Sequence, residues 1–260
     1  MLSAILWDVD GTLAETERDG HRVAFNEAFE ALAVPWRWDE EHYGALLQIA
    51  GGRERLLHDM QHQPRAPQNA AEREALAERL HSLKNDYYAR IVASGALPLR
   101  PGVRELMNDC VRDGVRMAIV TTTSRVNVGA LLAPHLGADW ESAFAVVVTA
   151  QESPRKKPDP QAYQLALQRL RLPTESVLAI EDSPAGVAAA CAAGVPVLVT
   201  CSYYFPSPPV RGWVAVGPSL GNCAGWQPAI ASGSAAAAAD RVALGQIQEW
   251  HAQAMARRAG

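Results

Sequence analysis

Short apolar runs rich in β-branched residues recur along the chain, and from residue 115 onward they alternate with stretches of helix length. The runs cover Ala4–Val9, Val115–Thr121, Phe144–Thr149, Val177–Ile180, Val195–Thr200 and Trp213–Val216. Apolar strands separated by helices are typical of βα units around a parallel sheet that is buried on both faces. The pattern therefore predicts an α/β fold built on a parallel sheet.

The segment between the first two runs breaks this alternation. Residues 17–92 contain no convincing strand, and apolar side chains recur there at three- and four-residue steps. The clearest series is Leu76, Leu80, Leu83, Tyr87 and Ile91. Because an insert of this length is too long for a crossover, we predict a separate all-helical domain at 17–92. The sheet domain is then formed by 1–16 and 93–218, with a Pro/Gly-rich hinge candidate at 93–102.

The last part of the chain carries weaker signals. Residues 231–240 are of low complexity and rich in alanine, whereas Leu244, Ile247 and Trp250 step by three. We predict that 219–260 forms a C-terminal tail with a short helix at its end.

Composition narrows the range of partners and compartments. The chain is 48% hydrophobic with a formal net charge of −4, so nothing in it favours nucleic acid or an anionic membrane as a partner. It shows no signal-peptide pattern and no apolar run of about 18 residues. Its cysteines lie far apart with no CxxC pair. We therefore expect a cytoplasmic monomer with reduced cysteines.

Four polar clusters follow the predicted strands. They are Asp8-Val-Asp10, Thr121–Ser124, Lys156-Lys157 and Glu181-Asp182. Because parallel strands present their carboxyl ends to one crevice, we expect these clusters to form a single site. Acids, hydroxyls and a lysine at successive strand ends are typical of an active site.

Phosphoryl transfer accounts for this assortment of side chains. Carboxylates of Asp8, Asp182 and Glu181 are the hard oxygen ligands that Mg²⁺ takes together with substrate phosphate oxygens. A Ser or Thr hydroxyl donates to the phosphoryl group, and Gly11 lets backbone N–H groups approach it. Of two adjacent aspartates, one can attack phosphorus while the other protonates the leaving oxygen and later activates water.

The lysines support the same interpretation. Of the 24 lysines and arginines only three are lysine, and two of these three are the neighbours Lys156 and Lys157. A compact ammonium suits phosphoryl oxygens, which would explain a lysine in so arginine-rich a chain. The sequence leaves open which of the two acts.

These motifs resemble the four ordered motifs of the haloacid dehalogenase (HAD) superfamily of phosphotransferases. The matching residues are Asp8-Val-Asp10-Gly11-Thr12, Thr121, Lys157-Pro158 and Glu181-Asp182-Ser183. The resemblance covers residues 1 to about 216, and it implies a Rossmann-like core in which the helical insert is the cap domain. It also implies a small phosphorylated substrate.

The resemblance implies a role for each motif residue. Asp8 would be the nucleophile that forms an aspartyl-phosphate, Asp10 the general acid and base, Thr121 the phosphoryl-oxygen donor and Lys157 the motif lysine. Mg²⁺ would be held by Asp8, the Asp10 carbonyl and Asp182, with Glu181 bound to the ion directly or through one of its ligands.

A narrower resemblance is to the CbbY group, whose members are sugar bisphosphate phosphatases acting on xylulose 1,5-bisphosphate. It is carried by Glu15-Thr-Glu17, His21–Asn26, Gly51–Arg55, Thr121–Thr123 and Lys156–Pro158. The run Arg18-Asp19-Gly20 is one residue longer than usual, which affects the expected position of Glu17. The substrate-binding residues that this resemblance implies are Glu17, His21, Gly51, Gly52, Arg53, Thr122 and Thr123, with Arg55 as the alternative to Arg53.

Other activities remain open at this stage. A β-phosphoglucomutase-type phosphotransferase would share every catalytic residue, and a phosphoglycolate-type phosphatase is a second alternative. A 2-haloacid dehalogenase needs neither Mg²⁺ nor a second aspartate, so Asp10 argues against it. A binding protein on the same scaffold would tolerate loss of the nucleophile, whereas this chain keeps the complete set.

Overall fold

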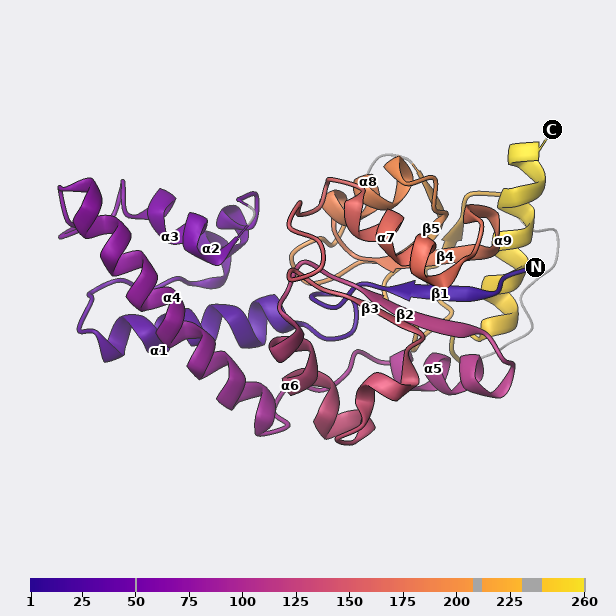
Figure 1. The fold of residues 1–260 in the computed structure, drawn as a ribbon, viewed down its shortest axis with the longest axis horizontal. Coiled ribbons are helices and arrows are strands. Elements are labelled where there is room, and N and C mark those ends of the chain that lie inside the picture. Colours follow the sequence, from indigo (N-terminus) through magenta and orange to yellow (C-terminus); the bar gives the residue numbers. More distant parts are fainter. Residues whose placement is uncertain (50, 208–211, 231–239, 260) are drawn as a thin grey trace. The chain divides into compact units, whose positions relative to one another are not determined.

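The computed structural model describes residues 1–49, 51–207, 212–230 and 240–259. The chain divides into two compact units (Figure 1). The core unit comprises Met1–Glu15 and Pro98–Gly260, and the cap unit comprises Thr16–Leu97. The unit borders therefore fall at 15/16 and 97/98, against the predicted 16/17 and 92/93.

A seven-stranded sheet forms the centre of the core unit, in the order β3-β2-β1-β4-β5-β6-β7. The strands are β1 (Ala4–Trp7), β2 (Arg116–Val120), β3 (Val146–Val148), β4 (Val177–Glu181), β5 (Val197–Thr200), β6 (Trp213–Gly217) and β7 (Gln227–Pro228). The first six strands are parallel, and β7 pairs antiparallel with β6. The predicted α/β fold with a parallel sheet is confirmed, and the six apolar runs are its parallel strands.

The register of the sheet aligns the strand ends that carry the polar clusters. In the central strand, Trp7 pairs with Ile119 of β2 on one side and with Ile180 of β4 on the other. The Asp8 N–H continues this ladder by donating to the Ile180 carbonyl at 3.1 Å. Residues that directly follow β1, β2 and β4 therefore leave the sheet side by side.

Helices cover both faces of the sheet: α7 and α8 lie on one side, and α5 and α6 on the other (Figure 1). Their bounds are α5 (Val103–Arg112), α6 (Arg125–Leu136), α7 (Gln161–Leu170) and α8 (Pro184–Ala192). Ala162, Ala166 and Val187 pack with strand residues such as Leu6 and Val120 in one buried cluster. Two-sided burial explains why the strands are apolar throughout.

The last residues belong to the core unit and are not a detached tail. Strand β7 extends the sheet, and α9 (Leu244–Ala259) packs against β6 and α5. Trp226 stacks on Trp250 of α9, with 5.3 Å between ring centroids. The predicted closing helix is present, while the alanine-rich 231–239 lies outside the described residues.

The described residues of the cap unit form helices and connections without a strand, as predicted. The helices are α1 (Arg22–Ala31), α2 (Glu40–Leu46), α3 (Gly52–Asp59) and α4 (Ala70–Ala93), and a short π-helical segment, Glu17–His21, leads into α1. The buried face of α4 consists of Ala77, Leu80, Lys84, Tyr88 and Val92. This face is shifted by one position from most of the predicted apolar series, because it is the face that packs on α1.

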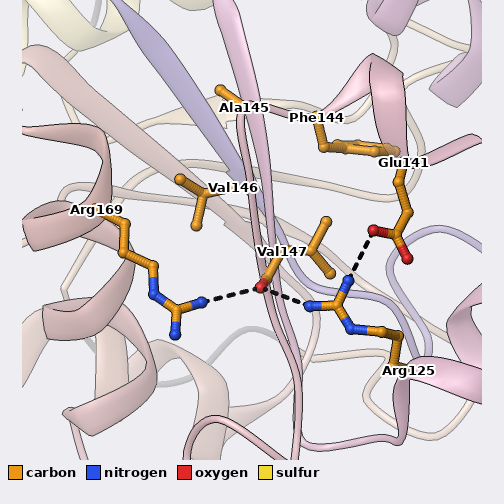
Figure 2. Close-up of a pocket in the computed structure, with 7 residues that line it drawn as sticks. All are labelled: Arg125, Glu141, Phe144, Ala145, Val146, Val147 and Arg169. Atoms are coloured by element: carbon orange, nitrogen blue, oxygen red, sulfur yellow. Dashed lines mark hydrogen bonds and ion pairs between the residues drawn. The ribbon is translucent and has the colours of Figure 1, made fainter.

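A pocket of about 360 Å³ lies at the edge strand β3. Figure 2 shows Arg125 and Arg169 reaching from two sides to the Val147 carbonyl, at 3.3 and 3.4 Å. These arginines, from α6 and α7, satisfy a backbone acceptor of the edge strand that could otherwise pair with another chain. No predicted site residue lines this pocket.

None of the helices among the described residues is both long and apolar enough to span a membrane.

Candidate active site

The structure brings five of the predicted residues together at the carboxyl edge of the sheet. Asp8, Thr121, Lys157, Glu181 and Asp182 are all buried, with at most 8% of each residue exposed. The lysine is at the centre of the group. Its Nζ lies 2.6 Å from Asp8 Oδ1, 2.6 Å from Glu181 Oε1 and 2.9 Å from the Val120 carbonyl.

The geometry distinguishes between the adjacent lysines. Lys157 is buried among carboxylates, whereas Lys156 is exposed. Of the two lysines, the structure therefore places only Lys157 among these carboxylates.

The turn after β1 holds Asp8, and the negative charge of Asp10 in the same turn makes a small contribution to the raised pKa of Asp8. The hydroxyl of Thr12 donates to Asp8 Oδ2 at 3.0 Å, so both oxygens of Asp8 have a donor. The Gly11 N–H donates to the Ala14 carbonyl at 2.8 Å and closes the turn. Gly11 has a φ of +82°, and a Cβ there would lie 2.0 Å from Asp182 Oδ2. Only glycine fits this position, because both the backbone angle and the contact exclude a side chain.

Glu181 is fully buried and holds Lys157 in place. Its Oε1 accepts hydrogen bonds from Lys157 and from the Tyr163 hydroxyl. A Cβ on Gly186 would lie 1.9 Å from Glu181 Oε2, so the start of α8 packs directly on this carboxylate. Burial, followed by the negative charge of Glu181, raises the pKa of the Tyr163 hydroxyl.

The electrostatics of the site show a shortage of positive charge. Burial, followed by the Glu181 charge, raises the pKa of Asp8 to about 7 even though Lys157 opposes the shift. The pKa of Asp182 is raised well above its usual value by burial and by Asp8 and Glu181. Burial lowers the pKa of Lys157, but the two carboxylates outweigh it and raise that pKa. Asp8 and Glu181 thus share Lys157, while the charge of Arg100 only partly opposes the raised pKa of Asp182.

This shortage fits a divalent cation. One oxygen from each of Asp8, Glu181 and Asp182 lies within 4.8 Å of the others. Ser202 donates to Asp182 Oδ2 at 2.7 Å, which orients that carboxylate. A hard cation that takes several carboxylate oxygens would balance their charge in this buried position.

The threonine run follows β2 as expected. The Thr121 N–H donates to the Val148 carbonyl at 3.0 Å, and the Thr121 hydroxyl accepts from the Thr123 N–H at 3.1 Å. A hydroxyl that accepts in this way keeps its own proton for another acceptor, such as a phosphoryl oxygen. Thr122 and Thr123 are half-buried.

In the cap unit, Glu17 meets Tyr43 and Arg55. The Tyr43 hydroxyl donates to Glu17 Oε2, and Arg55 Nη1 lies 3.5 Å from the same oxygen. The Arg55 guanidinium also donates to the Tyr43 hydroxyl at 3.2 Å and to the Ile49 carbonyl at 2.9 Å. His21 is buried and stacks on Tyr88, with 3.9 Å between ring centroids.

Arg53 is not brought together with Glu17. It pairs with Glu74 and, at 3.7 Å, with Glu78, both on α4. The glycines before it have structural reasons of their own. Gly51 has a φ of +109°, and a Cβ on Gly52 would lie 3.0 Å from the Phe25 ring. The structure thus assembles Arg55, the alternative, with Glu17.

Three further residues support the site and a fourth is buried in the cap unit; none of them was identified from the sequence as a site residue. Thr12, Tyr163 and Ser202 hold the carboxylates, and Lys84 is buried in the cap unit. The Lys84 ammonium lies 5.2 Å from the Phe25 ring centroid and 5.1 Å from that of Tyr88. The one signal in the sequence was that Lys84 is the third lysine of an arginine-rich chain. A tyrosine or a serine in an ordinary sequence context carries no such signal.

Comparison with known proteins gives the class to which this fold and site belong. The family model for haloacid dehalogenase-like hydrolases matches residues 2–194, and the chain belongs to this family. It is 41% identical to the protein CbbY of Cupriavidus necator over 251 residues, 96% of this chain and 97% of that protein. It is 44% identical to CbbY of Rhodobacter capsulatus over 203 residues, 78% of this chain and 87% of that protein. Within the family, the chain falls in the CbbY group.

Solved structures agree with this placement. CbbY from Rhodobacter sphaeroides, as a mutant in complex with xylulose-(1,5)bisphosphate, matches with a TM-score of 0.75 at 38% identity, covering 86% of this chain and 99% of that one. A β-phosphoglucomutase from Clostridium difficile matches with a TM-score of 0.68 at 19% identity, covering 98% of this chain and 100% of that one, which shows the fold alone. The resemblance inferred from the motifs is confirmed. The protein is an enzyme, a hydrolase of phosphoric monoesters.

Proposed function

We propose that the protein is a Mg²⁺-dependent phosphatase that hydrolyses a sugar bisphosphate such as xylulose 1,5-bisphosphate through an aspartyl-phosphate on Asp8. The observation that carries the proposal is the buried group of three carboxylates, two of which contact Lys157. An anionic phosphate ester could approach these acids only with added positive charge. The bisphosphate bound to the Rhodobacter sphaeroides relative supports the substrate class.

In the first half of the reaction the Asp8 carboxylate attacks phosphorus and Asp10, as the acid, gives its proton to the leaving sugar oxygen. Lys157 and the Thr121 hydroxyl contribute donors to the phosphoryl oxygens. Glu181 and Tyr163 keep the Lys157 ammonium in place. The bond from Thr12 to Asp8 Oδ2 restricts the rotation of the nucleophile.

In the second half, the Asp10 carboxylate takes a proton from water, whose oxygen attacks the phosphorus of the aspartyl-phosphate. Inorganic phosphate leaves, and both aspartates return to their starting states. Asp8, Asp182 and the Asp10 carbonyl would hold Mg²⁺, with Glu181 beside them. Such an ion, when bound, supplies positive charge to the carboxylates and the phosphoryl group.

In this proposal the cap unit supplies a cation for the remote phosphate of a bisphosphate. Arg55 presents a planar guanidinium that can engage two phosphate oxygens, and it is oriented by Glu17 and Tyr43.

Phosphate release from a panel of sugar mono- and bisphosphates, in Mg²⁺ and in EDTA, tests the proposal. We expect fastest release from the bisphosphate with Mg²⁺, and activity near background in EDTA. Asp8→Asn should retain less than a few per cent of the activity with an unchanged circular dichroism spectrum, because an amide cannot form the acyl phosphate. The matched variant Asp139→Asn, at an exposed position, should behave as wild type.

Two outcomes would contradict parts of the proposal. Full hydrolysis in EDTA would contradict the requirement for a metal. An active Asp8→Asn variant would contradict the covalent intermediate. An isomerised sugar phosphate formed without phosphate release would identify a mutase, which could use the same catalytic residues.

A further inference from the structure

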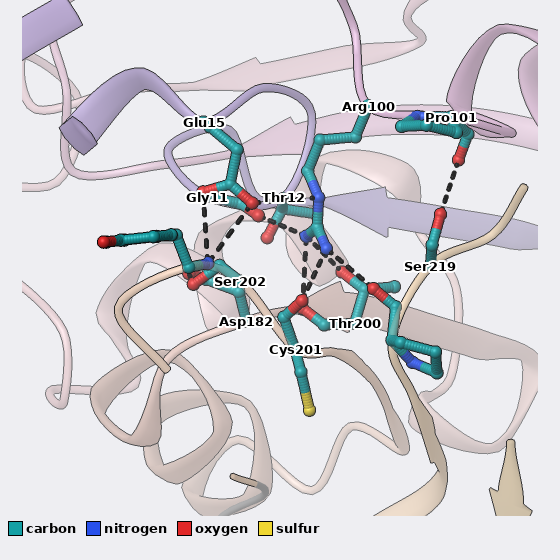
Figure 3. Close-up of polar contacts among 12 residues, drawn as sticks. Gly11, Thr12, Glu15, Arg100, Pro101, Asp182, Thr200, Cys201, Ser202 and Ser219 are labelled. Carbon is teal, nitrogen blue, oxygen red and sulfur yellow. Dashed lines mark hydrogen bonds and ion pairs between the residues drawn. The ribbon is translucent and has the colours of Figure 1, made fainter. Parts of the chain in front are cut away.

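Arg100 is a buried arginine that no sequence pattern indicated. It follows Pro98, where the chain re-enters the core unit, and its side chain is 9% exposed. The guanidinium donates to the backbone carbonyls of Gly11, Thr200 (3.2 Å), Cys201 and Pro218 (3.0 Å), and to the Thr200 hydroxyl at 3.1 Å (Figure 3). The backbone N–H of Arg100 donates to the Leu13 carbonyl at 2.7 Å.

The acceptors come from the ends of three strands. Gly11 lies in the turn after β1, Thr200 and Cys201 are at the end of β5, and Pro218 follows β6. Backbone carbonyls at or just beyond a strand end lie where the regular ladder stops, so a side-chain donor can satisfy them. A planar guanidinium has five N–H groups and can serve several of them at once, whereas an ammonium has three on one nitrogen.

Two of these acceptors lie on segments that approach the same oxygen of Asp182. The Gly11 backbone approaches Asp182 so closely that a Cβ would lie 2.0 Å from its Oδ2. Ser202 directly follows Cys201, and its hydroxyl donates to the same oxygen at 2.7 Å. Figure 3 shows Gly11, Asp182 and Ser202 grouped on one side of Arg100. Arg100 thereby anchors both neighbours of this carboxylate.

We infer that Arg100 is a positioning residue that sets the orientation of the Asp182 carboxylate for metal binding, through Gly11 and Ser202. The inference rests on the proposed function, because Asp182 is a ligand only if the metal site exists. Groups that orient a metal ligand typically contribute 10–100-fold in affinity or activity. A loss of that order is therefore expected when the guanidinium is removed.

The test measures binding of Mn²⁺, as a probe for Mg²⁺, by electron paramagnetic resonance without substrate. Arg100→Met should raise the dissociation constant by roughly 10–100-fold. The control is Arg116→Met, which removes a guanidinium that donates to a backbone carbonyl, that of Leu170, at the opposite end of β2. The control should stay within about twofold of wild type, because Arg116 touches no residue of the site.

A double-mutant cycle with Ser202→Ala adds a readout that a general structural role would not produce. Arg100 acts partly through Ser202, so the double variant should lose clearly less affinity than the product of the single losses. If Arg100→Met fails to fold, Arg100→Lys replaces it, because lysine keeps the positive charge but lacks the planar set of N–H donors.

Failure of this inference can be told apart from failure of the proposed function. Wild-type protein that binds no Mn²⁺ would overturn the metal site and, with it, the role of Arg100. The other case is wild-type protein that does bind Mn²⁺. If folded Arg100 variants then bind Mn²⁺ as tightly as wild type, or if their loss of affinity and that of Ser202→Ala simply multiply, only the role of Arg100 is overturned.

Discussion

Arg53 and Arg55 differ by two positions on α3, yet they have separate environments. On an α-helix two positions correspond to a rotation of about 200°, so their side chains leave on nearly opposite sides. Arg53 is directed to Glu74 and Glu78 of α4, and Arg55 to Glu17 and Tyr43. The same choice between neighbours arises at Lys156 and Lys157, of which only the second is buried.

Alanine variants of Arg53 and Arg55, measured in parallel, distinguish the roles of the two arginines. If Arg55 binds the remote phosphate, Arg55→Ala should lower kcat/KM for a sugar bisphosphate by about 1.5–3 kcal/mol, the range for a lost charge-assisted hydrogen bond. Arg53→Ala should change it by less than about 0.5 kcal/mol, because its ion pairs with Glu74 and Glu78 are exposed. Equal losses with a small monophosphate would instead assign Arg55 to the packing of the cap unit.

Helix α9 shows how an element without a conspicuous sequence signal is fixed. Asp109, buried on α5, accepts two hydrogen bonds from Arg241, at 2.8 and 3.1 Å, and one from the Leu244 N–H at 3.4 Å. It therefore binds the start of α9 to α5. The hydrogen bonds from Arg241 are the main reason that the pKa of Asp109 lies below its ordinary value of 3.8.

Urea unfolding of Asp109→Asn tests this connection. We expect a loss of about 1.5–3 kcal/mol at pH 7, the value of hydrogen bonds to a charged group. Since the folded pKa is depressed, the contribution is complete above 3.8 and disappears as the pH falls through the folded pKa, so the deficit of the variant should shrink below about pH 4. Asp113→Asn, at the exposed end of the same helix, should cost less than about 0.5 kcal/mol. A similar cost for both would contradict the role of Asp109.

Over the whole core unit, α9 joins elements from distant parts of the sequence. His251 on this helix is buried, and its Nε2 has no hydrogen-bond partner among the described residues. Burial lowers the pKa of His251, and the N-terminal ammonium and Arg258 act in the same direction, against a hydrogen bond with the Val177 backbone. The fold therefore favours the neutral form of this ring.

The stability of the protein should fall in mild acid as a result. The unfolded chain binds a proton on His251 near its ordinary pKa of 6.5, whereas the folded chain binds it only at a lower pH. Stability from this group is present above 6.5 and declines below it, by up to about 1.4 kcal/mol per pH unit, until the folded pKa is reached.

Unfolding midpoints of wild type and His251→Gln, measured between pH 5 and 8, would show this decline as a pH-dependent difference. The control His62→Gln, on an exposed histidine of the cap unit, should run parallel to wild type. A constant difference between wild type and His251→Gln would contradict the assignment.

Much of the architecture and the catalytic group followed from local patterns. Apolar runs became the parallel strands because a sheet covered on both faces requires apolar residues along its whole length. The clusters at Asp8, Thr121, Lys157 and Glu181-Asp182 were expected to meet because the carboxyl ends of parallel strands share one edge. Both inferences need only the order of residues and the geometry of the fold class.

The rest depended on side-chain direction and on long-range packing. The rotation of each helix or loop relative to the elements that it packs on decides three points. These are which lysine is buried, which arginine contacts Glu17, and which face of α4 packs on α1. The acceptors of the Arg100 guanidinium hydrogen bonds lie 89 to 118 positions away along the chain, and Arg241 and Leu244, which donate to Asp109, lie more than 130 positions from it. No local pattern encodes such contacts, because they form only after the sheet has brought the strand ends together.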